Sequence, residues 1–185
     1  MNIFRSRKTA VAVTAACVLA TTLLGSHRSL AAERRAVEAT MNQGADGSGA
    51  SIGGDLKRAC DIAANLHTVA RKYLAQTNPT SLSRLDAARQ GLESAQTAGE
   101  RKAALETLLG ESQGVAEELS EHSEVSEADR VYLAGFQIDL AAIADTVRRD
   151  PYNALAREFN EEILGRFPAN ALARITGVRP LETFD

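Results

Sequence analysis

Three polar residues share one face of a predicted helix near residue 60. Arg58, Asp61 and Asn65 are spaced i, i+3 and i+7, which places their side chains on the same side of a helix. A guanidinium, a carboxylate and an amide in this arrangement could bind a small polar ligand opposite the C-terminal helices. They could also form a satisfied interhelical hydrogen-bond network that fixes helix register. We favour the second, structural interpretation.

The residue types needed for metal or catalytic chemistry lack the required spacing. None of His27, His67 and His122 has a glutamate three residues before it, as the di-metal sites of helical bundles require. The sequence holds no His-Glu-x-x-His and no paired cysteines for zinc. It also lacks a phosphate-binding glycine loop, a nucleophile elbow and a serine–histidine–acid set. We therefore predict no catalytic residue, no metal, no cofactor and no enzymatic activity.

Acidic residues are concentrated at a predicted helix junction between residues 117 and 129. A solvated helix end is one explanation, and a site for a divalent cation or a basic partner is the other. The members are Glu117, Glu118, Glu121, Glu124, Glu127 and Asp129.

The charge distribution argues against nucleic acid as a partner. Residues 1–31 hold four of the 21 basic residues and none of the 24 acidic ones. The remainder therefore carries a net charge of about −7. Such a domain cannot neutralise phosphates, and anionic lipid would repel it. We exclude nucleic-acid binding and disfavour a membrane-perturbing role.

Residues 1–31 have the parts of an export signal. Arg5, Arg7 and Lys8 precede an uncharged, mostly apolar stretch over residues 10–25. That stretch spans roughly 24 Å as a helix, against about 30 Å for a hydrocarbon core, which favours a signal peptide. His27 and Arg28 weaken the cleavage site near Ala31, which favours an uncleaved anchor with its N-terminus inside. Both alternatives stay open, and either implies export.

The two cysteines predict no disulfide. Cys17 lies within the apolar stretch, and Cys60 lies on a predicted helix among apolar neighbours. A bond between them would require one end in the membrane. We expect Cys60 to be a buried, inert thiol.

The rest of the chain predicts an all-α protein. A short helix near residues 33–41 leads into a glycine-rich linker, and we expect Asp55 to cap the first bundle helix. Apolar residues then recur at helical spacing, interrupted at Asn78-Pro79, Gly99, Ser126 and Pro151. We predict an up-down antiparallel bundle of three or four long helices with a short C-terminal helix. Its closing helix carries a stripe that is stopped by Pro168, with Gly177 as the final cap: Leu155, Phe159, Ile163 and Phe167.

Two stretches of the sequence resemble the LemA family of membrane-anchored bacterial proteins. The first comprises Leu56-Lys57-Arg58, Asp61, Asn65-Leu66, Val69 and Tyr73. The second, more specific stretch comprises Tyr152-Asn153, Phe159-Asn160, Ile163, Phe167-Pro168, Asn170, Leu172-Ala173-Arg174, Gly177 and Phe184. The resemblance implies an N-terminal membrane segment that leads into a long-helix antiparallel bundle whose biochemical function is not established. From the residues themselves we expect these motif positions to be structural, with Asn170 as a cap before the final turn.

The chain departs from the family pattern at two places. A glycine-rich stretch separates the membrane segment from the first bundle helix. Before the tyrosine–asparagine pair, the family's polar stretch is altered to Ile143-Ala144-Asp145-Thr146-Val147, and Pro151 falls where the family has helix. We expect residues 1–31 to be a signal or anchor, 32–54 a short helix and linker, and 55–185 a LemA-like bundle. The predicted function is a non-enzymatic exported or membrane-anchored bundle that acts on a protein partner in the cell envelope. The alternative is a small-ligand or metal-binding bundle that uses polar residues between the first and C-terminal helices.

Overall fold

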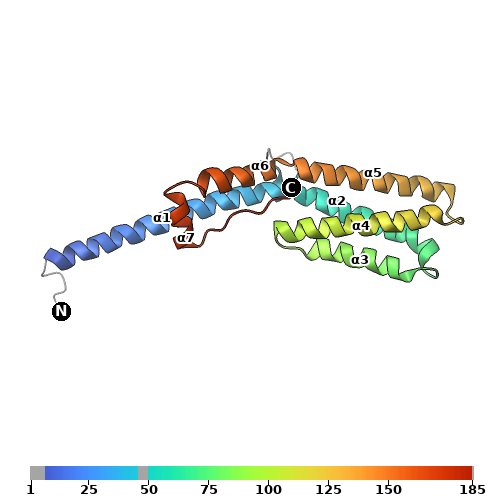
Figure 1. The fold of residues 1–185 in the computed structure, drawn as a ribbon, viewed down its shortest axis with the longest axis horizontal. Helices are drawn as coiled ribbons and strands as arrows, with labels where there is room; N and C mark the ends of the chain where they lie inside the picture. Colours follow the sequence, from blue (N-terminus) through green and yellow to red (C-terminus); the bar gives the residue numbers. More distant parts are fainter. Residues whose placement is uncertain (1–6, 46–49, 185) are drawn as a thin grey trace. The chain divides into compact units, whose positions relative to one another are not determined.

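The computed structural model describes residues 7–45 and 50–184, without the side chain of Lys8, and this part of the chain is helical with no strand (Figure 1). Arg5 and the centre of the glycine-rich segment lie outside the described residues. The elements are α1 (Arg7–Gln43), α2 (Ile52–Leu74), α3 (Pro79–Ser94), α4 (Ala98–Glu121), α5 (Glu127–Arg149), α6 (Pro151–Glu158), the π-helical turn η2 (Phe159–Ile163) and α7 (Ala169–Thr176). The all-α prediction is confirmed.

The chain divides into two compact units. Unit 1 combines Met1–Glu38 with Leu155–Leu181, and unit 2 combines Ala39–Ala154 with Glu182–Asp185. Unit 2 contains the predicted bundle, in which α2 packs on α3, α4 and α5 and α3 packs on α4 (Figure 1). Short turns join these four long helices in up-down order. Apolar residues spaced three or four apart form the buried face of α2: Leu56, Ala59, Cys60, Ala63, Leu66, Ala70 and Leu74.

Side-chain oxygens cap the first turn of each bundle helix. Ser126 accepts from the backbone N–H of Asp129, as the sequence predicts. Asn78, which we expected only to interrupt the helices, caps α3 by accepting from the N–H of Ser81. The cap of α2 is Ser51, which accepts from the N–H of Gly54; the prediction that Asp55 fills this role is wrong. Asp55 lies inside the first turn, where its negative charge interacts favourably with the positive end of the helix dipole.

Two glycines assigned to the flexible linker are instead part of α2. Gly53 and Gly54 lie in its first turn. A Cβ at Gly53 would come within 2.7 Å of Asn42 Oδ1 and 3.3 Å of Asn42 Cα. Glycine is needed here because the last turn of α1 passes against the first turn of α2.

The break before α4 lies at residues 95–97 and not at Gly99. Thr97 and Glu100 form a capping box, in which the Thr97 hydroxyl accepts from the N–H of Glu100 and the Glu100 carboxylate accepts from the N–H of Thr97. Gly99 is therefore the second residue of the helix. Gly110 and Gly114 lie within α4 without interrupting it.

The N-terminal helix is longer than the sequence predicts. One continuous helix, α1, replaces the separate apolar segment and short helix that we expected. Of the described helices, it alone is long and apolar enough to cross a membrane, a test that a signal sequence also passes. Its apolar residues are exposed or half-buried as far as Leu24, whereas Leu30 and Val37 are buried.

The closing segment also differs from the predicted single stripe. Phe159 is 1% exposed, but Phe167 is 84% exposed, so the stripe ends before Phe167. The reason is the π-helical turn η2, which adds a residue to the turn and rotates later residues off the face. Regular α-helix therefore stops at Glu158, and the π-helical turn ends at Ile163, before the cis Phe167–Pro168 bond. Gly177 ends α7 with φ +76°, the left-handed cap that the sequence predicts.

Candidate functional site

Tyr152 and Asn153 hold the last described residues of unit 2. The Asn153 side-chain amide donates to the carbonyls of Val147 and Arg148, both at 3.1 Å, and its oxygen accepts from the N–H of Phe184 at 2.8 Å. The Tyr152 hydroxyl donates to the carbonyl of Glu182 at 2.9 Å. Asn153 thus satisfies orphan carbonyls at the end of α5. All its polar atoms are engaged with main chain, which leaves none for a ligand.

Asn160 has the same role within unit 1. Its amide nitrogen donates to the carbonyl of Leu181, and its oxygen accepts from the N–H of Leu181, both at 2.8 Å. Leu181 is itself buried. We expected Asn170 to cap α7, and this prediction is wrong. Asn170 lies inside the helix, and Pro168 occupies the cap position. Proline can precede the helix because its ring fixes φ near the helical value.

The C-terminal segment also completes the start of α4. The Glu182 carboxylate accepts from the N–H of Gly99 at 2.7 Å, while Glu100 accepts from the N–H groups of Gln96 and Thr97 at 2.9 and 3.0 Å. These backbone donors lower the pKa of Glu100. The Thr-x-x-Glu pattern of Thr97 and Glu100 was readable in the sequence; nothing local indicated Glu182.

Arg58, Asp61 and Asn65 do not form a shared site. Arg58 pairs with Asp55 at 3.4 Å and Asp61 with Lys57 at 3.0 Å, both within α2. Asn65 is exposed. The predicted interhelical network is wrong, because all three side chains are exposed and the ion pairs of Arg58 and Asp61 stay within α2.

Asp61 does lie on the wall of a groove of about 380 Å³ within unit 2. Lys57, Arg101, Glu93 and Cys60 also line it. Charges of both signs surround the opening, so no single ligand charge is favoured. Burial raises the pKa of Cys60 to about 11, which keeps the thiol protonated and unreactive, as the sequence predicts.

The acidic junction contains residues in different environments. Asp129 is 9% exposed and accepts from the Tyr73 hydroxyl at 2.5 Å, from Lys72 at 3.1 Å and from Ser126 at 3.1 Å. The Tyr73 hydrogen bond is the first cause of its lowered pKa, followed by that from Lys72. Glu118 is also engaged, since it accepts from Asn78 and Ser81 at 2.9 and 2.8 Å.

These partners give the two carboxylates a structural role, and the rest of the junction does not assemble a metal site. Nowhere in residues 7–45 and 50–184 do three His, Cys, Asp or Glu residues come together in a way that could hold a metal ion.

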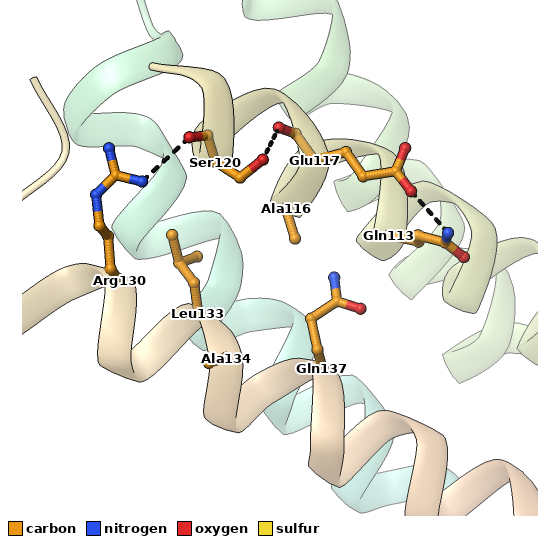
Figure 2. Close-up of a pocket in the computed structure, with 8 residues that line it drawn as sticks. All are labelled: Gln113, Ala116, Glu117, Ser120, Arg130, Leu133, Ala134 and Gln137. Atoms are coloured by element: carbon orange, nitrogen blue, oxygen red, sulfur yellow. Dashed lines mark hydrogen bonds between the residues drawn. The ribbon is translucent and has the colours of Figure 1, made fainter. Parts of the chain in front are cut away.

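Arg130 fastens the turn between α4 and α5, a role that no local sequence pattern indicates. Its guanidinium donates to the carbonyls of Ser120 and His122, both at 3.1 Å. Beside it lies an open groove of about 310 Å³. Figure 2 shows α4 contributing Gln113, Ala116, Glu117 and Ser120, and α5 contributing Arg130, Leu133, Ala134 and Gln137. The groove has an apolar floor and a hydrogen-bonded polar rim, without a constellation for catalysis.

Compared with protein-family models, with curated proteins and with solved structures, the chain matches none of them. The described geometry contains capped helices, main-chain clamps and shallow grooves. These features define the class as an all-α helical protein with one N-terminal helix that is long and apolar enough to be a membrane span or a signal.

Proposed function

We propose that this chain is a non-enzymatic, membrane-anchored helical-bundle protein of the LemA type that acts through protein contacts in the cell envelope. The first half of α1 would be the anchor, and the bundle would lie outside the cytoplasm. The sequence resemblance described above supports this assignment, as does the positive charge before the apolar stretch.

One observation carries the proposal. No residue in the apolar window of α1 is buried, and Val11, Val18, Leu19 and Leu24 are 69%, 58%, 65% and 63% exposed. An apolar helical surface of this length is costly in water, and lipid would cover it. Retention is favoured over cleavage because a cut after Ala31 would remove Leu30, which is buried in unit 1.

The polar residues that could have formed a ligand site support the same proposal. Asn153 and Asn160 use their amides on backbone groups, and Asn65 points into solvent. A ligand site would require several unsatisfied polar atoms facing one cavity. The structure gives no specific support to the ligand-binding alternative.

The proposal is tested by fractionating cells that express the full chain and measuring its mature N-terminus by mass spectrometry. We expect the membrane fraction to contain the chain with an intact N-terminus. Protease should digest the bundle only when it is added to the non-cytoplasmic face of the membrane. A soluble chain that begins at Ala32 or Glu33 would rule out the anchor. Digestion from the cytoplasmic face would rule out the proposed topology.

A matched pair of arginine substitutions isolates the role of the apolar stretch. Val18→Arg introduces a charge that costs about 2.5–3.5 kcal/mol at the centre of a membrane helix, so membrane association should fall. Val131→Arg places the same change at an exposed valine of the bundle and should leave fractionation unaltered. Equal fractionation of the two variants would contradict anchoring by α1.

A further inference from the structure

Helix α5 has two apolar faces, of which only one is used inside the chain. Its inner face is buried or half-buried and includes Leu133, Leu140, Ile143 and Val147, with α2 as the main neighbour. Two of its apolar side chains, Val131 and Ile138, are nevertheless 66% and 69% exposed. A surface helix normally shows a single apolar stripe. The second face therefore requires its own explanation.

One set of exposed and half-buried residues of α5 follows the spacing of a helix-pairing seam, with Gly135 and Asp145 as its half-buried members. Their intervals alternate between three and four, which is the heptad pattern of core positions in paired helices. This outer seam, as we define it, consists of Ala128, Val131, Gly135, Ile138, Ala142 and Asp145. Three inner residues, Leu133, Leu140 and Val147, lie two positions, about 200°, beyond a seam residue, and Ile143 lies one position, about 100°, beyond Ala142. The inner and outer faces therefore point in different directions.

From this pattern we propose that the outer seam of α5 binds the same seam of a second copy of this chain, with the two helices antiparallel. The inference names a second copy as one partner of the protein contacts in the proposed function, and it rests on that function only for the membrane that concentrates the two chains.

Antiparallel pairing places large seam residues opposite small ones. With the two-fold axis between residues 136 and 137, Val131 faces Ala142 of the second copy and Ile138 faces Gly135. A Cβ at Gly135 would meet nothing within 4 Å inside the chain. The glycine therefore fulfils no packing need within the monomer although it weakens the helix by roughly 1 kcal/mol relative to alanine. Close approach of a second helix at Ile138 gives it a use.

Charges beside the seam select the antiparallel direction. Helix α5 begins with Glu127 and ends with Arg148 and Arg149. In antiparallel heptads the positions that flank the core meet their own kind, which brings Glu127 of each copy to Arg148 of the other. Two-fold symmetry makes this pair twice. Glu127 and Arg148 are both exposed, and within the described chain neither takes part in an ion pair. Parallel pairing would instead bring like ends together.

The contact is small, so the membrane matters for its strength. The seam extends over roughly 26 Å of helix, which corresponds to the lower end of specific interface sizes. Anchoring restricts both copies to one surface and raises their effective concentration. We therefore expect a weak dimer in dilute detergent and a clear dimer in membranes.

Charge reversal gives the first test, on the full chain in liposomes and in detergent with chemical cross-linking. Glu127→Arg and Arg148→Glu should each reduce the cross-linked dimer about tenfold, because two attractive pairs become repulsive. The two changes together in one chain should restore it. Failure of the double variant to recover would overturn the antiparallel pairing, and loss of dimer in none of them would overturn the interface.

The apolar seam is tested with a matched pair of substitutions. Ile138→Asp should abolish the dimer, whereas Ile175→Asp, at an isoleucine that is 68% exposed in unit 1, should not. Both sites are on the surface, and circular dichroism checks that each variant folds. Likewise Gly135→Leu should block pairing, and Gly110→Leu, at an equally open glycine of α4, should leave it intact. Equal dimer yields within either pair would contradict the proposal.

Helix direction is tested by disulfide formation in a Cys17→Ser background. Chains with Val131→Cys mixed with chains with Ala142→Cys should form the mixed disulfide in preference to either symmetric one. A dominant symmetric disulfide would show parallel pairing and overturn the antiparallel inference, and cross-linking only to other proteins would assign the seam to a different partner. A dimer in detergent together with a chain that does not fractionate with membranes would refute the proposed function and leave this inference standing.

Discussion

Asn160 binds Leu181 through both ends of its side-chain amide, with two hydrogen bonds of 2.8 Å to the N–H and carbonyl of one residue. The amide thereby substitutes for a neighbouring backbone. Leu181 is buried, so water cannot replace these bonds without opening the segment.

We expect Asn160→Ala to lower the free energy of unfolding by about 1–3 kcal/mol, because both backbone groups of Leu181 lose their partner. Asn160→Asp keeps the acceptor and loses the donor, so the carboxylate would face the carbonyl of Leu181. Its stability should improve at acid pH, where the protonated side chain donates again. Urea unfolding of the full chain in mild detergent measures both effects. Asn65→Ala is the control, and a loss as large as that of Asn160→Ala would contradict the assignment.

The capping box of α4 predicts a local loss of stability. Thr97→Ala removes the acceptor for the N–H of Glu100 and should cost about 1 kcal/mol. Hydrogen exchange should accelerate in the first turn of α4 and not in α3. Thr68→Ala, at an exposed threonine within α2, provides a threonine control. Uniform acceleration over all helices would argue against a capping role.

Ser112 presents the opposite case, a polar group that the fold does not use. It is fully buried in α4, and its hydroxyl has no hydrogen-bond partner in the described structure. Ser112→Ala should therefore leave stability unchanged or raise it by about 0.5–1 kcal/mol. Ser120→Ala is the comparison in the same helix, because the Ser120 hydroxyl does have a partner and donates to the Glu117 carbonyl. Both substitutions change helix propensity in the same way, so their difference reports the hydroxyl environment. A loss above 1 kcal/mol at Ser112 would show that the hydroxyl has a partner.

Acid should destabilise the protein partly through Asp129. Donation from Tyr73 and Lys72 lowers its pKa below the ordinary 3.8, so the unfolded chain takes up its proton at a higher pH than the folded chain. The contribution is complete above the ordinary pKa and is lost as pH falls through the lower folded value. Asp129→Asn and Tyr73→Phe should both flatten the dependence of the urea midpoint on pH below about 5. An unchanged slope in both variants would show that other carboxyls dominate.

Local sequence signals predicted most of the helices but not the way the chain closes on itself. Asn78-Pro79, Ser126 and Gly177 act within a few residues of themselves, so their spacing was sufficient. The replacement of Asp55 by Ser51 depended on the approach of Asn42, because the Ser51 hydroxyl also donates to the Asn42 carbonyl at 3.1 Å.

The candidate site was harder to predict because its residues depend on distant partners. Tyr73 meets Asp129 and Glu182 meets Gly99 only after the helices have packed. The exposure of Phe167 follows from a π-helical turn, which a regular helical period cannot anticipate. Tertiary contacts explain the first two cases, and an irregular turn of the backbone explains the third.

The side-chain amides of Asn153 and Asn160 form their hydrogen bonds with backbone groups and not with other side chains. Each fixes the position and direction of one residue, Phe184 or Leu181, whatever occupies the positions between them. The Glu182 side chain is constrained because its carboxylate accepts from the N–H of Gly99, whereas the Thr183 side chain makes no such hydrogen bond in the described structure. We therefore expect substitutions to be tolerated at Thr183 and not at Asn153 or Asn160. The backbone positions of Leu181 and Phe184 are thus set by asparagines 21 and 31 residues before them in the sequence.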